Sequence, residues 1–208
     1  MPLAKPKPGA KTKLLDAAVN VIRARGYSAT TVDELCENAG VTKGAFFHHF
    51  ASKQDLAVAA ARHFSSMADG LFSTASYREL PDPVDRLLGY VKFRESLLQG
   101  ELPEFTCLVG TMVQETYGTH PAIRKACDRS LREHTDMLEA DIAAALHTYG
   151  GDGQWNAESL AIYMQAVIQG AFIFAKARNG PAVAAACLDH LRRYIQTLFA
   201  PPQKRKRH

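Results

Sequence analysis

The sequence has 208 residues, of which 47% are hydrophobic and 22% charged, a composition that excludes disordered and fibrous chains. Its four cysteines include no CxxC pair, so we expect neither a disulfide scaffold nor a zinc knuckle, and we expect a cytoplasmic location. The net charge of +4 is unevenly spread: nine Lys and Arg face five Asp and Glu in 1–66, twelve face sixteen in 67–203, and four basic residues lie in 204–208. The basic N-terminal part therefore favours a polyanionic partner.

Apolar residues recur at spacings of three and four, and no stretch alternates with a period of two, so the sequence predicts helices without strands. A basic arm at 1–10 precedes a helix over 12–25 that Gly26 ends. Shorter helices are expected over 31–40 and 42–49, followed by a longer one over 52–70. The remaining predicted helices are 82–99, 106–117, 121–149, 157–178 and 181–199. The predicted fold class is therefore all-α, with about nine helices.

Residues 30–56 have the pattern of two helices joined by a tight turn. Thr31 and Glu34 form a candidate capping box at the start of the first helix. Gly40 supplies the positive φ that ends this helix, and Thr42 caps the next one. A turn of three or four residues that contains Gly is typical of the helix-turn-helix motif.

The helix predicted over 42–49 has a surface suited to DNA. Its first turn is small or basic, so the backbone can approach base edges and its exposed N–H groups attract phosphate. We expect Lys43 to reach a guanine edge and Lys53 to contact phosphate only. The predicted DNA-binding residues are Thr31, Thr42, Lys43, Gly44, Ala45, Phe47, His48, His49 and Lys53. Lysines of the arm, Lys5, Lys7, Lys11 and Lys13, either contact DNA or remain solvated, and the tail at 204–208 is expected to be solvated.

The run GVTKGAFFHHFASKQDL at 40–56 resembles the DNA-reading segment of TetR-type (TetR/AcrR) transcriptional regulators. The resemblance continues upstream through TTVDELCENAG and KTKLLDAAVNVIRARGYSATTV, and CLVGTMVQE and VIQGAFIFAKARNGP are similar to phrases from the ligand-binding halves of one branch. It implies an all-α homodimer that binds double-stranded DNA at a palindromic operator and leaves it when a small-molecule effector binds. Phe47 and His48 stand where the family usually has two tyrosines, so one phenolic phosphate contact is absent and an imidazole replaces the other.

These features divide the chain into an arm at 1–10, a DNA-binding domain at 11–70, a ligand-sensing and dimerisation domain at 71–200, and a tail at 201–208. Polar and soft residues on the otherwise apolar helices of the third segment are candidate effector contacts, and each also has the ordinary interpretation of a core or surface position. The candidates are Phe93, Phe105, Cys107, Met112, Glu115, His134, Met137, Tyr163, Gln165, Gln169 and Phe172. Cys107 has two open interpretations: a thiol activated near a helix N-terminus, as in some electrophile-sensing relatives, or a small buried filler.

The helix over 157–178 is apolar almost all round. Its uncharged stretch, 159–175, is too short for a membrane span and includes Gln165, Gln169 and Gly170, so we interpret it as a helix buried on both faces. The last helix carries a second apolar stripe, formed by Val183, Cys187, Leu191, Tyr194 and Leu198. Two such helices from each of two chains would make a four-helix dimer interface.

Two rival classes of protein find less support in the sequence. It has no Glu-x-x-His pair, GxSxG elbow, P-loop, GxGxxG or HExxH motif, so we expect no enzyme, no cofactor and no metal site. A helical adaptor that binds only protein would leave the basic face at 42–53 without a role. The sequence therefore predicts a ligand-responsive repressor that a small organic molecule releases from DNA.

Overall fold

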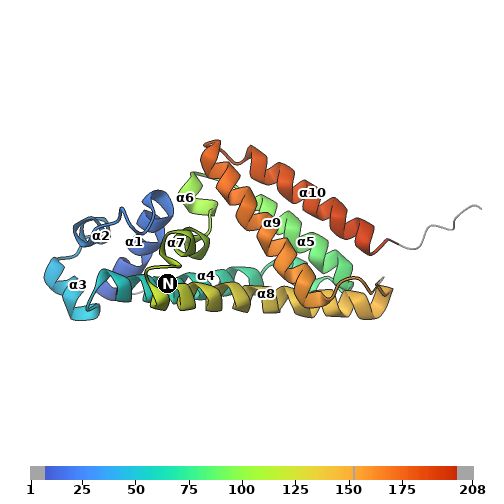
Figure 1. Ribbon diagram of the computed structural model, residues 1–208, viewed down its shortest axis with the longest axis horizontal. Coiled ribbons are helices and arrows are strands. Elements are labelled where there is room, and N and C mark those ends of the chain that lie inside the picture. Colours follow the sequence, from blue (N-terminus) through green and yellow to red (C-terminus); the bar gives the residue numbers. More distant parts are fainter. Residues whose placement is uncertain (1–7, 152, 201–208) are drawn as a thin grey trace, which may run out of the picture. The chain divides into compact units, whose positions relative to one another are not determined.

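The computed structural model describes residues 8–151 and 153–200, which form ten α-helices and one 3₁₀ helix without a strand (Figure 1). The helices are α1 (Ala10–Arg25), α2 (Val32–Ala39), α3 (Lys43–His49), α4 (Lys53–Ser73), η1 (Ser76–Glu79), α5 (Pro83–Ser96), α6 (Leu102–Phe105), α7 (Leu108–Thr116), α8 (Pro121–Tyr149), α9 (Ala157–Ala177) and α10 (Ala182–Leu198). The all-α prediction is confirmed. The tail at 201–208 and the first seven residues of the predicted arm lie outside the described residues.

The sequence predicts about nine α-helices and the described residues form ten, because α6 has no counterpart among the predicted helices. This helix is a single turn, too short for an apolar period to appear in the sequence. It follows Gly100, which has φ +77°. The helix predicted over 82–99 corresponds to α5, which ends earlier, at Ser96. The helix predicted from residue 106 corresponds to α7, which begins at Leu108 because Cys107 serves as its N-cap.

The helices group into two compact units. Among the described residues, the first comprises those up to Ala68 together with Thr106–Leu131, and the second comprises Asp69–Phe105 and those from Arg132 onward. This division differs from the linear one expected at residue 70, because residues 106–131 pack with the N-terminal helices. α4 and α8 each pass from one unit into the other.

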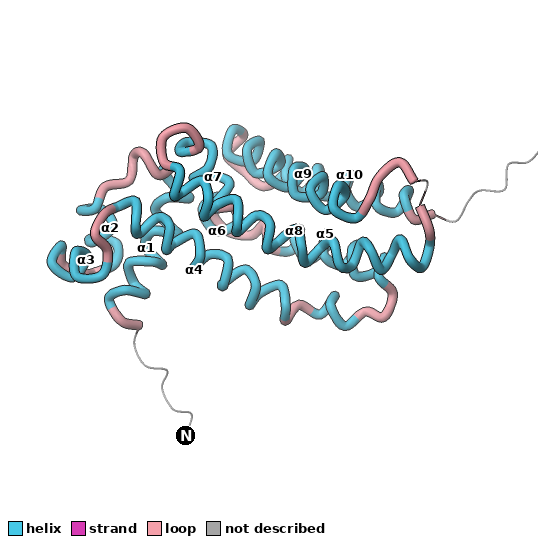
Figure 2. The backbone as a smooth tube through the Cα atoms, turned by 60° about the horizontal axis from the view of Figure 1, so that its bottom comes forward, coloured by secondary structure: helices cyan, strands magenta, loops and turns pink. Residues whose placement is uncertain are grey.

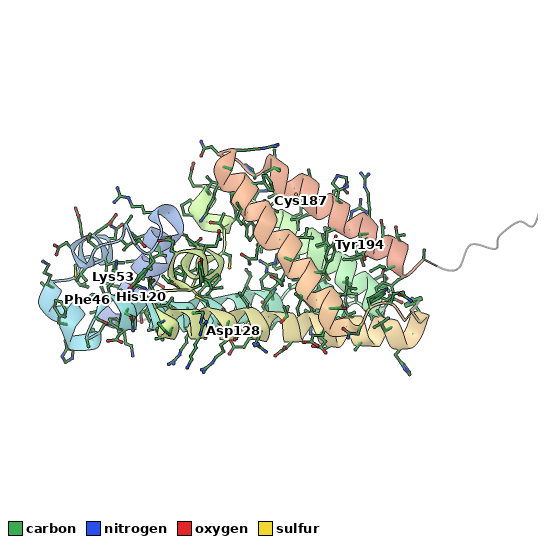
Figure 3. The ribbon with its side chains drawn as sticks, viewed as in Figure 1. Phe46, Lys53, His120, Asp128, Cys187 and Tyr194 are labelled. Carbon is green, nitrogen blue, oxygen red and sulfur yellow. The ribbon has the colours of Figure 1, made fainter. Side chains whose placement is uncertain are left out.

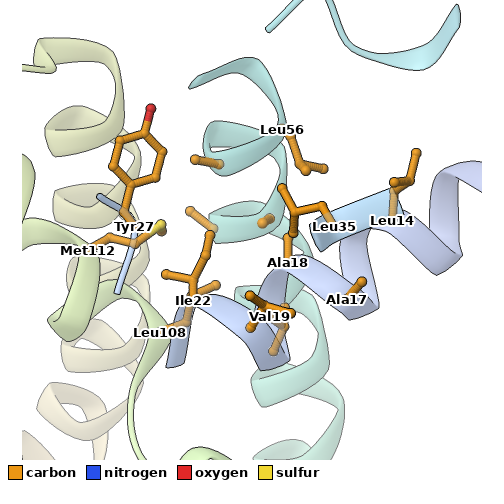
Figure 4. Close-up of a cluster of buried hydrophobic side chains, with 14 of the residues drawn as sticks. Leu14, Ala17, Ala18, Val19, Ile22, Tyr27, Leu35, Leu56, Leu108 and Met112 are labelled. Atoms are coloured by element: carbon orange, nitrogen blue, oxygen red, sulfur yellow. The ribbon is translucent and has the colours of Figure 1, made fainter. Parts of the chain in front are cut away.

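The core of the first unit joins the helix-turn-helix to α7 and the start of α8. Leu14 and Ile22 of α1 pack in one cluster with Leu35 of α2, Phe46 of α3 and Leu56 of α4. The same cluster includes Leu108 and Met112 of α7, both fully buried (Figure 4). It also includes Ile123 of α8, which is fully buried. Burying each such side chain stabilises the fold by about 1.5–3 kcal/mol, so α7 is a structural part of the first unit.

In the second unit, α10 packs against both α5 and α9, and Figure 2 shows α9 and α10 side by side. Buried residues such as Leu87, Met164, Ile168 and Leu188 form its interior. By length and composition α9 could cross a membrane, a property that core helices share, and 44% of its most apolar window is buried in the structure.

Candidate nucleic-acid interface and buried polar cluster

The turn between α2 and α3 has the geometry that the sequence predicts. The Thr31 side chain accepts a hydrogen bond from the Glu34 N–H (3.2 Å), and Thr42 accepts one from the Ala45 N–H (3.1 Å). Gly40 adopts the left-handed conformation (φ 61°, ψ 43°). The Glu34 carboxylate pairs with Arg25 of α1 instead of completing the expected capping box, so it ties α2 to α1.

Helix α3 is held by two aromatic side chains and exposes the rest of its surface. Phe46 is fully buried and Phe50 is nearly so, with ring centroids 5.9 Å apart. Of the predicted DNA-binding residues on this helix, Lys43, Gly44, Phe47 and His48 are exposed, while Ala45 and His49 are half-buried. The Phe47 side chain is 58% exposed, an arrangement that suits contact with another molecule better than packing within this unit.

Lys43 and Lys53, for which different DNA contacts are predicted, have different surroundings. Lys43 lies in solvent and pairs with Asp33 at 2.6 Å, and an exposed ion pair of this kind contributes about 0–1 kcal/mol. Lys53 is half-buried: its Nζ donates to the carbonyls of Tyr27 (3.0 Å) and Thr30 (2.8 Å) and lies 4.3 Å from the centroid of the Tyr27 ring (Figure 3). Burial lowers the pKa of Lys53, and the nearby Glu115 partly opposes this change. Two of its three ammonium hydrogens are thus directed to the α1–α2 turn.

Glu115, a candidate effector contact, lies in the first unit and supports the α1–α2 turn. Its carboxylate accepts hydrogen bonds from the N–H groups of Tyr27 (3.1 Å) and Ser28 (2.8 Å). Gly26 precedes them with φ 85°, and a Cβ at that position would collide with a carboxylate oxygen of Glu115. The sequence does not reveal this role, because the partners of the carboxylate are main-chain N–H groups, which every residue type except proline offers.

Other contacts also join the loops that flank α7 to α1 and to the α1–α2 turn within the first unit. Arg23 donates to the Thr106 carbonyl at 3.2 Å, and the Tyr27 ring meets His120 edge-on at 5.2 Å. Met112, a candidate pocket wall, is fully buried in the core of this unit. The predicted effector set is therefore divided between the two units, and Met112, Glu115 and Cys107 belong to the first.

The Cys107 side chain is half-buried at the N-cap of α7, where its Sγ accepts a hydrogen bond from the Gly110 N–H at 3.4 Å. Cys127 is fully buried, and burial, with a smaller effect of Cys107, raises the pKa of the Cys127 thiol to about 12. Cys127 is thus held as an inert thiol, because thiolates are the reactive form. The electrophile-sensing interpretation of Cys107 remains a prediction.

A polar cluster inside the second unit brings two of the predicted effector contacts together. His134 of α8 and Gln165 of α9 meet Tyr90 and Arg94, which lie one turn apart on α5. Gln165 Nε2 and Arg94 Nε both donate to the Tyr90 hydroxyl at 2.9 Å. His134 Nε2 lies 2.9 Å from the Tyr90 hydroxyl and 2.9 Å from Arg94 Nη2. We call these four residues the Arg94 cluster.

Aromatic rings surround the Arg94 cluster. The Phe72 ring centroid lies 4.9 Å from that of His134 and 4.4 Å from the Arg94 guanidinium carbon. Phe93, a predicted pocket wall, meets Phe72 edge-on at 5.4 Å. Burial, with a smaller effect of the Arg94 charge, lowers the pKa of His134 to about 3, so this imidazole is neutral at pH 7. Sequence reasoning missed Tyr90 and Arg94, although their spacing of four places them on one helix face.

The remaining effector candidates do not join the Arg94 cluster. Phe105 and Phe172 pack on each other at 6.3 Å, and Met137 and Gln169 are half-buried. Tyr163 lies on the outer side of α9, where its ring pairs with Tyr194 of α10 at 5.2 Å.

The outer side of α9 and α10 is apolar and exposed. Ile162, Ile173 and Phe174 of α9 are 49–54% exposed, and Tyr163 and Tyr194 are 45% and 41% exposed. In the predicted stripe of α10, Leu191 is already buried within the unit, whereas Cys187 is half-buried and Tyr194 faces solvent (Figure 3). Large apolar side chains exposed on one pair of helices are typical of a surface that associates with another protein or a membrane.

Comparison with known proteins identifies both parts of the chain. Residues 14–60 match the family model described as "Bacterial regulatory proteins, tetR family", and residues 83–188 match "Transcriptional regulator LmrA/YxaF-like, C-terminal domain". The transcriptional repressor KstR2 of Mycobacterium tuberculosis (strain ATCC 25618 / H37Rv) is 38% identical over 81 residues. This match covers 37% of the present chain and 38% of KstR2, so well under two thirds of that relative is represented.

Solved structures extend the similarity to nearly the whole chain. A TetR-family regulator from Agrobacterium tumefaciens has a TM-score of 0.80 at 19% identity, covering 92% of this chain and 98% of its own. The reduced form of NemR from Escherichia coli has a TM-score of 0.77 at 21% identity, covering 94% and 100%. At these identities the likeness establishes a common fold.

Proposed function

Because the chain belongs to the TetR family of bacterial regulatory proteins, we propose that it is a cytoplasmic transcriptional repressor that binds an inverted-repeat operator as a homodimer and leaves it when a small organic molecule binds. The observation that carries the proposal is the capped helix-turn-helix, in which buried Phe46 and Phe50 leave Lys43, Gly44 and Phe47 exposed on α3. An exposed lysine suits the recognition of base edges, because Lys can bind guanine O6 and N7 in the major groove.

Within this proposal the two lysines act differently. Lys43 has only a weak exposed ion pair to give up, so it is free to reach a guanine, a contact worth about 1–3 kcal/mol of discrimination. Lys53 fixes the α1–α2 turn and retains one ammonium hydrogen for a phosphate. Thr31 and Thr42 cap the N-termini of α2 and α3. His48 and His49 are available to contact the phosphates that flank the recognition helix.

The exposed apolar face of α9 and α10 supports the homodimer. Ile162, Ile173, Phe174 and Tyr194 need a partner that removes them from water, and a second copy of the same face is self-complementary under two-fold symmetry. A dimer also explains why α9 carries apolar side chains on the side that is exposed to solvent in the single chain. The candidate partner is thus another copy of this chain rather than a membrane.

Release by an effector requires that the effector and the operator favour different conformations of the dimer. α4 and α8 pass from the first unit into the second, so a change in either helix is transmitted along a continuous backbone. Glu115 of α7 binds the α1–α2 turn, and Arg23 of α1 binds the Thr106 carbonyl just before α7, so a movement of α7 would act directly on this turn. An effector that shifts these helices would therefore change how α3 is presented to DNA.

The decisive experiment is selection of DNA by the pure protein from a random pool, followed by binding measurements on the enriched sequence. We expect an inverted repeat whose half-sites are spaced by about one helical turn, ~34 Å, or a multiple of it. If about six to ten phosphates are neutralised, the affinity falls by roughly a thousandfold or more between 50 and 200 mM salt. A pool that yields no enriched sequence, or an affinity that does not change with salt, would rule out operator binding.

A further inference from the structure

Arg94 differs from other arginines of the second unit in the charge of its partners. Arg78 and Arg86 both bind the Asp141 carboxylate, at 2.6 and 2.7 Å, and Arg192 and Arg193 both bind Asp189. In the part of the chain that the structure describes, the Arg94 guanidinium has a phenol and a neutral imidazole as its hydrogen-bond partners, and an aromatic ring against its face. A half-buried cation is thus placed among neutral groups.

The Arg94 cluster also holds more donors than acceptors. The Tyr90 hydroxyl accepts from both Arg94 and Gln165, so its own proton points to a third group. The nearest acceptor is His134 Nε2, which Arg94 Nη2 also approaches. A neutral imidazole nitrogen has a single lone pair, so it cannot fully satisfy both donors. An additional acceptor at this place would relieve the competition.

A second observation, independent of Arg94, indicates the same deficiency. Tyr77 packs beside the cluster with its ring centroid 6.0 Å from that of Tyr90 and 5.8 Å from that of Phe93. Its side chain is 5% exposed, and within the described residues its hydroxyl has no hydrogen-bond partner. Buried hydroxyls are almost always hydrogen-bonded, so a ring that packs against the cluster carries a further donor without an acceptor.

We propose that the Arg94 cluster binds the carboxylate of a small organic acid, with Arg94 as its charge partner and the Phe72 and Phe93 rings against the apolar body of the acid. The planar guanidinium presents paired N–H groups that match the two oxygens of a carboxylate. The Tyr90 hydroxyl binds the guanidinium directly, and Gln165 holds this hydroxyl in place, so both residues fix the orientation of Arg94. This inference rests on the proposed function, since it gives the chemical class of the effector.

A carboxylate suits this cluster better than a neutral or cationic ligand. A cation would meet the positive charge of Arg94 without a compensating acid in the cluster, and a neutral amide would bring donors to a place already rich in them. The neutral state of His134 leaves the net charge of the cluster at one, which a single carboxylate balances. The aromatic rings account for an apolar body attached to the acid group.

The test measures ligand binding to the full-length protein without DNA. The probes are benzoate, phenylacetate, 3-phenylpropionate and octanoate, each compared with its primary amide, and inorganic phosphate at equal ionic strength controls for a general salt effect. We expect at least one acid to raise Tm by about 5–10 °C at a hundredfold excess over its Kd, while its amide and phosphate do not. Titration calorimetry gives the affinity of each acid.

Variants of Arg94 then assign the binding to this cluster. Arg94→Gln is expected to weaken the acid at least tenfold, Arg94→Lys to retain part of the affinity, and Lys92→Gln, an exposed change on the same helix, to have no effect. Circular dichroism verifies that each variant folds. If Arg94→Gln does not fold, the comparison of Arg94→Lys with the wild type, together with the acid–amide pairs, carries the test.

Two results would overturn the proposal: a wild-type protein that no acid stabilises beyond its amide, or an Arg94→Gln variant that binds the acid as tightly as the wild type. Operator binding is measured separately. An acid that binds through Arg94 but leaves operator affinity unchanged supports the cluster as an acid site and contradicts effector-driven release. A protein that binds its operator but none of the acids rejects this inference and leaves operator binding standing.

Discussion

Gly44 lies in the first turn of α3 at an exposed position that its own fold does not require to be glycine. Its φ is not positive, and a Cβ there would meet nothing nearer than the Thr42 hydroxyl at 3.7 Å. Alanine in a helix stabilises a protein by about 0.4–1 kcal/mol relative to glycine when the backbone is compatible. The absence of a side chain at this position therefore serves contact with another molecule better than it serves stability.

We expect Gly44→Ala to retain or raise the free energy of unfolding while weakening operator binding about tenfold or more, because the methyl group separates the backbone of α3 from the base edges. Urea unfolding and fluorescence anisotropy measure the two effects. Gly70→Ala, an exposed change in α4 where a Cβ meets nothing within 4 Å, is the control and should leave operator affinity unchanged. Equal operator affinities for Gly44→Ala and the wild type would remove α3 from the proposed interface.

His134 makes the stability of the protein depend on pH. Burial and Arg94 lower its pKa from 6.5 to about 3 in the folded state, so below pH 6.5 the unfolded chain binds a proton that the folded chain does not. Stability is therefore unaffected by this group above pH 6.5 and falls below it, by up to about 1.4 kcal/mol per pH unit. The loss continues until the folded-state pKa is reached.

Because other histidines also titrate, the prediction concerns a difference between two proteins. We expect the free energy of unfolding of the wild type to fall more steeply between pH 6.5 and 5 than that of His134→Gln, which has no titrating group at this position. Urea unfolding at several pH values measures both slopes. Parallel pH profiles would show that His134 titrates normally in the folded protein.

At the scale of elements, α7 links segments that are far apart in the sequence. Glu115 accepts two main-chain hydrogen bonds from the α1–α2 turn, and Lys53 donates two to the same turn. The turn precedes Thr31, the N-cap of α2, so these side chains determine where the helix-turn-helix begins. A charged partner makes these hydrogen bonds stronger than neutral ones.

Glu115→Gln is expected to destabilise the first unit by about 1–3 kcal/mol, because the amide can accept one of the two N–H bonds but presents its own donors to the other. Hydrogen exchange should show faster exchange of the Tyr27 and Ser28 amides. Glu133→Gln, an exposed change on α8, is the matched control. Unchanged exchange at these two amides would mean that Glu115 does not hold the turn.

The elements that sequence predicts well are those with local signals. The caps of α2 and α3 follow from Thr31, Gly40 and Thr42, because each acts within three or four residues of its position. By contrast, α6 has only four residues, too few to show the apolar periodicity by which a helix is recognised in a sequence. The placement of 106–131 in the first unit depends on burial of Leu108 and Met112 against α1, a long-range choice that amphipathic patterning alone does not specify.

The candidate sites show the same division. The exposed residues of α3 follow from a contiguous motif, whereas the Arg94 cluster assembles groups from α5, α8 and α9. The sequence marks His134 and Gln165 as polar residues on apolar helices, whereas no pattern in it singles out Tyr90 or Arg94. It groups Glu115 with the first two because a sequence gives the side chain and not the main-chain groups that the side chain binds.

At the scale of the whole molecule, the proposed function depends on pairing of two chains. The exposed apolar residues of α9 and α10 belong to one unit, and the recognition helix belongs to the other. A dimer that contacts two half-sites gains affinity because the second contact becomes intramolecular, an advantage of about 10²–10⁴ over one contact alone. A substitution that dissociates the dimer should therefore weaken operator binding although the structure of α3 is unchanged.

Phe174→Glu tests this dependence, because it places an uncompensated carboxylate on the apolar face, where Phe174 is 54% exposed in the single chain. We expect a folded monomer in sedimentation at micromolar concentration and a loss of operator affinity of about a hundredfold or more. Ala140→Glu adds the same charge at an exposed position of α8 and should remain a dimer with normal affinity. A Phe174→Glu protein that stays dimeric would place the interface elsewhere. A monomer that binds the operator as tightly as the wild type would show that one helix-turn-helix suffices.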